Sequence, residues 1–313
     1  MFQQNAAILG SIGEYVSIAE TGSEVSLWKY VERHKLAIDR ALENSLPLAP
    51  TSIEGQFNEA VRYLIFPGGK RLRPILTMLG AELFGGKAEN VMHAAAAVEF
   101  IHTSSIIFDD LPCMDNSPHR RGRLSLHEKF GEGLSTLVAI AFLNHSYRLV
   151  TLDVGENPRR TLDAVLEIVD CVGPAGMVGG QTVDLMVFGK AECRTCAIRE
   201  SRDLQNLKTS ALIRLSLNLG AILSGADDEG LAHLTCFADC LGHAYQLSDD
   251  IIDVEQDAST NALEYRKNES AALRNDLGLA AGRARSILST QFAPSEARGC
   301  LEQLVDYVVT RKE

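Results

Sequence analysis

The sequence lacks several features that would divide it or direct it to a membrane. Its 313 residues contain no Pro-, Ser- or Gly-rich linker, charge block or low-complexity tract, so we expect one domain over residues 1–313. Met1 to Glu20 has no basic segment followed by an apolar one, which argues against a secretory signal. No run of about 18 uncharged apolar residues is present. We therefore expect a cytoplasmic protein without a membrane span.

Cysteines are few and lack the spacing of a disulfide framework. Their odd number, seven, is typical of reduced thiols in a cytoplasm. Cys193 and Cys196 have the spacing of half a zinc site, but no second CxxC or nearby His pair completes it. We interpret them as incidental thiols, and Cys236 and Cys240, one helical turn apart, as core residues.

A basic face is also lacking, since the formal net charge is −11. This argues against a nucleic-acid partner, although a local anion site is still compatible with it. With 46% hydrophobic and 23% charged residues, the chain is an ordinary globular protein that can bury a large core.

Strand-like alternation is almost absent, and nearly every periodic segment has helical spacing. The Ala-rich segment 88–108 is apolar on most faces, which is typical of a helix buried inside a bundle. Pro74 and the Gly85–Gly86 pair are suited to the start and the end of one helix. We predict an all-α fold of about ten helices. The helical segments are 25–44, 54–65, 74–84, 88–108, 124–152, 161–187, 200–224, 228–254 and 295–311.

One acidic cluster lies in YQLSDDIIDV, residues 245–254. A helix places Asp249 and Asp253 on one face, with Asp250 beside them. Without a cation, like charges about 4 Å apart would repel by roughly 1–4 kcal/mol per pair. The cluster therefore indicates a bound hard cation, or else a solvated acidic helix end.

A second acidic cluster lies in IIFDDLPCMD, residues 106–115. Asp109 and Asp115 are six residues apart, so a straight helix would point them roughly 120° away from one another. We expect the helix to end near Pro112, so that a distortion or loop brings Asp115 back to Asp109 and Asp110. Oxygen ligands of this kind favour Mg²⁺, which also shares phosphate oxygens with a substrate.

Basic residues accompany the acidic clusters. They occur in GGKRLRP (68–74), in Arg120–Arg121–Gly122 and in Lys208–Thr209. Each patch alone is more often a solvated face, and the absence of GxxxxGK[ST] excludes a P-loop. Together with two Asp-rich clusters they indicate two anionic groups, one held through magnesium and the other by cations.

Six motifs in this order resemble those of the trans-isoprenyl diphosphate synthases, within the polyprenyl synthetase family. They are GGKRLRP (68–74), HTSSIIFDDLPCMD (102–115), RRG (120–122), GGQTVDL (179–185), KTSALI (208–213) and YQLSDDIIDV (245–254). They cover about residues 54–256, and the similarity is greatest to geranylgeranyl and farnesyl diphosphate synthases. The resemblance implies a helical bundle of the isoprenoid synthase type around a central cavity, and a homodimer.

The resemblance also implies a reaction and the residues that serve it. Isopentenyl diphosphate would condense head to tail with an allylic diphosphate of C5 to C15, with Mg²⁺, three ions when substrate is bound, stabilising the departing diphosphate. The implied catalytic residues are Asp109, Asp110, Asp115, Lys208 and Asp249. The implied metal ligands are Asp109, Asp110, Asp115, Asp249, Asp250 and Asp253. Isopentenyl diphosphate would be held by Lys70, Arg73, His102 and Arg121, and the allylic substrate by Arg120, Lys208, Thr209 and Gln246.

Ser104 and Ser105 carry the expectation for product length. In the family, an aromatic residue near these positions blocks the growing chain. Two serines favour C20 geranylgeranyl diphosphate over C15 farnesyl diphosphate, with Phe100, roughly 13 Å below Asp109, as the floor of the tunnel. The alternative is that the serines only allow close helix packing and that residues from neighbouring helices close the tunnel.

The sequence departs from the family pattern in four places. It has VAIAFLN (138–144) where a Gly-Asp pair is common, and no Gly-Lys within 255–282. LSLHEKFGE follows RRG, although His127 is kept, and Asn116–Ser117–Pro118–His119 replaces the usual acidic residues. Alternative functions are a non-catalytic regulatory subunit of a prenyl synthase and a class I terpene cyclase. A cyclase has no need of GGKRLR, and the Glu-x-x-His pairs of a di-iron bundle are not found at the acidic clusters.

Overall fold

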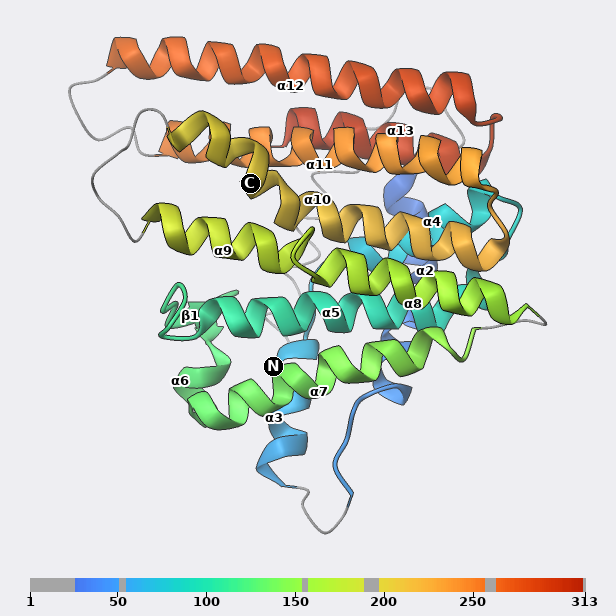
Figure 1. Ribbon diagram of the computed structural model, residues 1–313, viewed down its shortest axis with the longest axis vertical. Helices are drawn as coiled ribbons and strands as arrows, with labels where there is room; N and C mark the ends of the chain where they lie inside the picture. Colours follow the sequence, from blue (N-terminus) through green and yellow to red (C-terminus); the bar gives the residue numbers. More distant parts are fainter. Residues whose placement is uncertain (1–25, 51–54, 154–156, 189–196, 257–262, 312–313) are drawn as a thin grey trace.

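The computed structural model describes residues 26–50, 55–153, 157–188, 197–256 and 263–311. The described chain is almost entirely helical, which confirms the all-α prediction (Figure 1). The helices are α2 (Leu27–Asn44), α3 (Gln56–Ile65), α4 (Leu72–Leu83), the 3₁₀ helix η1 (Ala88–Val91), α5 (Met92–Asp110), α6 (Leu126–Phe130), α7 (Glu132–Val150), α8 (Pro158–Val172), α9 (Met177–Phe188), α10 (Ala197–Ser224), α11 (Asp228–Gln256), α12 (Leu263–Gln291) and α13 (Glu296–Thr310). A two-stranded hairpin joins β1 (His119–Arg120) to β2 (Arg123–Leu124).

Helix α5 lies inside the bundle and packs against α4, α7, α10 and α2 (Figure 1). Its residues Ala94 to Ile101 are all buried, as the Ala-rich segment predicts, because small side chains let neighbouring helices approach on several faces. Among the described residues, Ala88–Asp110 is the one stretch long and apolar enough to cross a membrane by length and composition alone. However, 67% of its apolar window is buried inside the fold, as the position of a core helix requires.

Helices α4 and α10 touch through their backbones. A Cβ atom added to Gly80 would lie 2.2 Å from the Leu217 carbonyl oxygen, and one added to Gly220 would lie 1.9 Å from the Thr77 carbonyl oxygen. Only glycine fits at both positions, so the two helices form a closely packed pair. This pair carries Arg73 at the start of α4 and Thr209 within α10, both of which reach the functional site.

Two of the predicted helical segments are each divided in the structure. Segment 161–187 becomes α8 and α9, because Gly173 and Pro174 end the first helix before Met177 begins the second. Segment 124–152 becomes α6 and α7 at Gly131, whose φ of 83° is in the left-handed region that favours glycine. Periodicity continues across both interruptions, so the sequence pattern does not reveal them.

Helix α12 was not among the predicted segments. The helix is polar on average, but it has a row of buried apolar residues at helical spacing: Leu273, Leu277, Ala280, Ala284 and Leu288. This narrow apolar stripe packs α12 against α11 at the top of the bundle in Figure 1. A search for spaced alanines as well as leucines would have found it.

The hairpin follows directly after the first acidic cluster. His119 pairs with Leu124 and Arg120 with Arg123, so Arg121 and Gly122 form the two-residue turn. Both have positive φ, 54° and 72°, as this turn requires. The turn thereby separates the two arginines, because Arg120 lies in a strand and Arg121 at its tip.

Candidate active site

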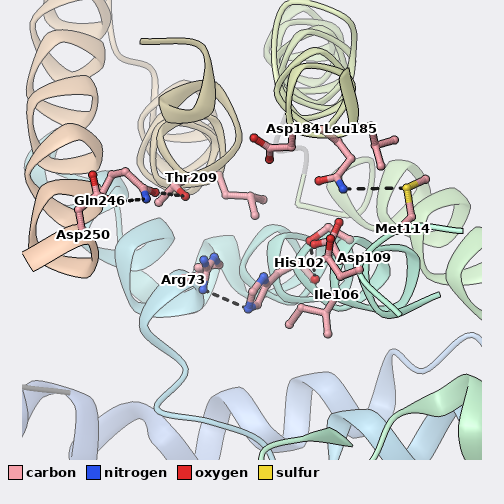
Figure 2. A pocket seen from close by; sticks show the side chains of 14 residues that line it. Arg73, His102, Ile106, Asp109, Met114, Asp184, Leu185, Thr209, Gln246 and Asp250 are labelled. Carbon is pink, nitrogen blue, oxygen red and sulfur yellow. Dashed lines mark hydrogen bonds between the residues drawn. The ribbon is translucent and has the colours of Figure 1, made fainter. Parts of the chain in front are cut away.

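A cavity of about 910 Å³ opens between α4, α5, α9, α10 and α11 (Figure 2). Polar and charged side chains from all five helices reach it, and apolar side chains occupy the rest of its wall. Its lining residues are Arg73, His102, Ser105, Ile106, Asp109, Met114, Asp115, Gln181, Asp184, Leu185, Thr209, Leu212, Gln246 and Asp250. Motifs far apart in the sequence are therefore brought to one place.

The first acidic cluster is shaped by the end of α5. The helix stops at Asp110, and the chain turns back so that the Asp115 backbone N–H donates to the Asp109 carbonyl oxygen at 2.9 Å. Asp109 and Asp115 both line the cavity. This confirms the expectation, based on their six-residue spacing, that the helix ends there and a loop returns Asp115.

Asp110 does not join them at the cavity wall. Its carboxylate is buried and accepts hydrogen bonds from Arg120, with Arg120 Nε 3.1 Å from Oδ1 and a shorter contact from Nη2. The hydrogen bond to Asp110 raises the pKa of the Arg120 guanidinium. Asp110 of α5 and Arg120 of β1 are thus bonded to each other, and their roles as metal ligand and substrate-binding cation stay predictions.

The second acidic cluster contributes Asp250 to the cavity. Gln246 Nε2 donates to Asp250 at 3.2 Å, and Thr209 Oγ1 donates to Gln246 Oε1 at 3.4 Å (Figure 2). Asp249, one residue earlier, is directed to Arg311 instead. The side chains of Asp253 and Lys208 lie outside the described residues.

Two basic side chains, Arg73 and His102, lie side by side in the wall of the cavity. Arg73 Nη1 lies 3.1 Å from His102 Nε2, and the Arg73 side chain projects from the first turn of α4 (Figure 2). Burial lowers the pKa of the Arg73 guanidinium, and the neighbouring positive charge of Arg121 lowers it further. A desolvated guanidinium of this kind is suited to a phosphate group, whose charge would compensate the burial.

Two neighbouring cations of the GGKRLRP loop, Lys70 and Arg71, have different surroundings. Arg71 is buried and bonded to Asp39 and Glu99 at 2.9 and 2.8 Å, so it joins α2 and α5 to the start of α4. Lys70 is exposed at the protein surface, with its Nζ 3.2 Å from the Tyr307 hydroxyl and 5.7 Å from the centre of the Trp28 ring. Arg71 therefore stabilises the fold, whereas Lys70 lies at the surface of the loop.

Arg121 lines a smaller cavity of about 230 Å³, together with Pro67 and Gly68 of the segment that leads into α4. A Cβ atom added to Gly69 would lie 3.3 Å from the Arg121 Nη2 atom. The loop backbone at Gly69 therefore lies close to the Arg121 guanidinium.

A third cavity, about 240 Å³ and mostly apolar, extends between α5, α7, α8 and α9. It shares Ser105, Asp109, Met114, Gln181 and Leu185 with the main cavity, so the two meet at the first acidic cluster. Its other lining residues are Ile101, Ser104, Phe108, Leu143, Val172, Met177, Val178 and Thr182. Both predicted serines therefore line an apolar space directly below the carboxylates.

Phe100 does not close this space. Its ring is fully buried against Phe142, with centroids 5.1 Å apart, and it is not among the residues lining the cavities described above. The far wall is made instead by Leu143 of α7 and by Val172 and Met177 at the corner between α8 and α9. Residues of neighbouring helices rather than Phe100 therefore line this end of the cavity, as the alternative expectation stated.

The prediction omitted Asp184 and Gln181 of α9, which both line the cavity. Figure 2 shows Asp184 facing Asp109 across the open space. The signal for them was present, since both belong to the motif GGQTVDL and lie three residues apart, on one face of a helix.

The carboxylates fit a divalent cation that also binds its substrate. Asp109, Asp115, Asp184 and Asp250 line the same cavity from three directions and supply only oxygen. Among the described residues, no group of three His, Cys, Asp or Glu side chains is close enough to hold a metal by itself. The set therefore suits Mg²⁺, which takes one or two carboxylates and completes its shell with water and phosphate oxygens.

Fold and site together define an all-α protein with a carboxylate-rich cavity flanked by buried arginine and floored by an apolar space. The family model "Polyprenyl synthetase" matches residues 54–264. The chain belongs to this family, as the six motifs indicated.

Named relatives agree with this membership. The chain is 36% identical to a chloroplastic geranylgeranyl pyrophosphate synthase of Capsicum annuum over 242 residues, 77% of this chain and 64% of the relative. It is 32% identical to a dimethylallyltranstransferase of Fischerella ambigua, over 98% of this chain and 90% of the relative. The chain thus spans less than two thirds of the Capsicum relative and most of the Fischerella one.

A solved structure supports the fold. The crystal structure of an FPP/GFPP synthase from Zymomonas mobilis superimposes with a TM-score of 0.78 at 29% identity, covering 90% of this chain and 98% of that one.

Proposed function

We propose that the chain is a prenyltransferase that condenses isopentenyl diphosphate head to tail with an allylic diphosphate. The observation that carries this proposal is the continuity of the main cavity with the apolar one at Asp109. A diphosphate at the carboxylates and an isoprenoid chain in the apolar space would belong to one molecule. Relatives named as geranylgeranyl pyrophosphate synthases support the same reaction class.

Magnesium would be held by Asp109 and Asp115 on one side of the cavity and by Asp250 on the other. It would neutralise charge on the diphosphate that leaves the allylic carbon. Asp184 faces the same space and would orient the water shell or a phosphate oxygen. Asp249 and Asp253 are further ligands by resemblance, while Asp110 would act through Arg120 by fixing the hairpin.

The second substrate would be bound by cations without metal. Arg73 and His102 face the cavity together. Lys70 belongs to the GGKRLRP loop that precedes Arg73, and Arg121 lies close to Gly69 of this loop. These positive charges would hold isopentenyl diphosphate with its double bond directed toward the allylic carbon. On the allylic side, Thr209 and Gln246 form a hydrogen-bonded pair next to Asp250, where Lys208 follows from the resemblance.

For the product, we propose C20 geranylgeranyl diphosphate. Ser104 and Ser105 are small, so the entrance to the apolar cavity stays open below the carboxylates. The names of the plant relatives support the same length. Farnesyl diphosphate is the alternative, because the similar solved structure is titled an FPP/GFPP synthase.

We also propose a homodimer. Neighbouring helices α7 and α8 both expose large apolar side chains, which a monomer rarely leaves in contact with water. The residues are Leu137, Ile140, Leu162, Leu166 and Val169, each 47% exposed or more. Replacement of Leu137 and Leu162 by Glu should shift the mass measured by light scattering from two chains to one.

The experiment that tests the function is incubation of the purified chain with isopentenyl diphosphate and each allylic diphosphate from C5 to C15, with and without Mg²⁺. We expect elongation only with the metal. Turnover that persists after chelation of divalent ions would overturn the proposal. Absence of turnover under all conditions would favour the regulatory-subunit alternative.

A further inference from the structure

Arg311 directly follows α13 and binds the second acidic cluster. Its side chain is only 3% exposed, although Asp249, to which Nη2 donates a hydrogen bond, is 42% exposed. Nε donates to Ser248 Oγ at 2.9 Å, and Nη2 also donates to the Tyr245 carbonyl oxygen at 2.9 Å. The guanidinium carbon lies 3.7 Å from the centre of the Tyr245 ring.

These contacts fix the guanidinium independently of Asp249. Ser248 and the Tyr245 carbonyl are neutral acceptors, and the ring face adds a cation–π contact. Arg311 is therefore a stationary positive charge at the cluster rather than a mobile surface arginine. The next carboxylate, Asp250, is left to the cavity.

We propose that Arg311 is a positioning residue that competes with a divalent cation for Asp249. The proposal rests on the proposed function, because Asp249 is a metal ligand there. In the cation-free protein, Arg311 neutralises the Asp249 carboxylate and holds it away from the cavity. Entry of a cation at Asp249 requires the carboxylate to leave or share this guanidinium, so the second acidic cluster binds metal more weakly than the carboxylates of Asp249 and Asp250 alone would.

The structure indicates why the competition opposes metal binding. A guanidinium in hydrogen-bond contact with a carboxylate repels a dication that approaches the same group, and burial reduces the screening by water. In the first acidic cluster, the arginine Arg120 binds Asp110, which does not line the main cavity.

Binding of Mn²⁺ to the substrate-free protein tests the proposal, with free Mn²⁺ measured by electron paramagnetic resonance. Arg311→Gln should tighten the weakest Mn²⁺ site by about tenfold. Arg298→Gln is the matched control, because Arg298 lies in the first turn of α13, roughly 20 Å along the chain axis from Arg311, and is bonded to Glu302. Its affinity should equal that of the unaltered chain. Unchanged or weaker binding in Arg311→Gln would overturn the proposal.

A double variant separates direct competition from a general field effect. In an Asp249→Asn background, Arg311→Gln should leave Mn²⁺ affinity unchanged, because no carboxylate remains to compete for. Equal tightening in both backgrounds would contradict direct competition. Arg311→Met, which keeps an unbranched side chain but removes the charge, should tighten binding like Arg311→Gln and serves if the glutamine variant does not melt cooperatively.

These measurements do not depend on turnover. If the chain proves inactive with all allylic substrates, the proposed function fails while the Mn²⁺ affinities still decide the role of Arg311. If turnover is found but Arg311→Gln binds Mn²⁺ like the unaltered chain, only the competition is wrong.

Discussion

The Ser104 hydroxyl donates a hydrogen bond to the Ala139 carbonyl oxygen at 2.9 Å, which joins α5 to α7 beside the apolar cavity. Both serine side chains therefore have structural contacts as well as a position on the cavity wall: Ser105 bonds to the His102 carbonyl oxygen of its own helix.

Ser104→Phe should shorten the product from C20 to C15. The aromatic ring would enter the apolar cavity just below Asp109, at a cost of about 1–3 kcal/mol for overpacking. Chromatography of the dephosphorylated products measures the length, and a thermal melt verifies folding. Ser146→Ala is the control, since Ser146 is also buried and bonded to a neighbouring helix but does not line the cavity. An active Ser104→Phe protein with unchanged products would show that Ser104 does not determine length.

Leu143→Ala should lengthen the product, because Leu143 forms part of the far wall of the apolar cavity. Phe100→Leu should leave the length unchanged and instead lower the free energy of unfolding by about 1–2 kcal/mol, because its ring packs on Phe142. The same product assay and a denaturant titration distinguish the two. Longer products from Phe100→Leu would restore Phe100 as the floor.

Asp110→Asn should destabilise the fold, whereas Asp115→Asn should raise the Mg²⁺ concentration needed for half-maximal turnover. Asp110 is buried against Arg120, so loss of its charge should cost about 1–3 kcal/mol of unfolding free energy. Asp115 is exposed at the cavity mouth, so the unfolding free energy of the Asp115→Asn protein should hardly change. Equal melting temperatures for the Asp110 variant and the unaltered chain would contradict a structural role.

Isopentenyl diphosphate should change the fluorescence of Trp28, the single tryptophan of the chain. Lys70 lies over both Trp28 and Tyr307, and a diphosphate bound by Lys70 would move the ammonium group relative to the indole ring. The alcohol isopentenol, which lacks the diphosphate, should have no effect, and Lys70→Gln should abolish the response. An identical response in Lys70→Gln would place the binding elsewhere.

The local features of this protein were predictable, but several long-range contacts were not. Helical spacing identified the segments that became α2, α10, α11 and α13, and the six-residue spacing of Asp109 and Asp115 predicted the end of α5. The pairing of Arg311 with Asp249 joins residues 62 positions apart, and nothing in either local sequence indicates it. Periodicity reports which residues face a core, but it does not report which helix supplies the opposite side.

The close backbone contacts of α4 with α10, at Gly80 against Leu217 and at Gly220 against Thr77, have a consequence for motion. Two helices whose carbonyl oxygens occupy the space of missing Cβ atoms have no room to slide or rotate against each other. Arg73 and Thr209 are therefore carried by one rigid body. Opening of the cavity to release the proposed isoprenoid product would then come from displacement of the helices around this pair. This makes α9, with Asp184 on the facing wall, the first place to look for exchange on the millisecond timescale.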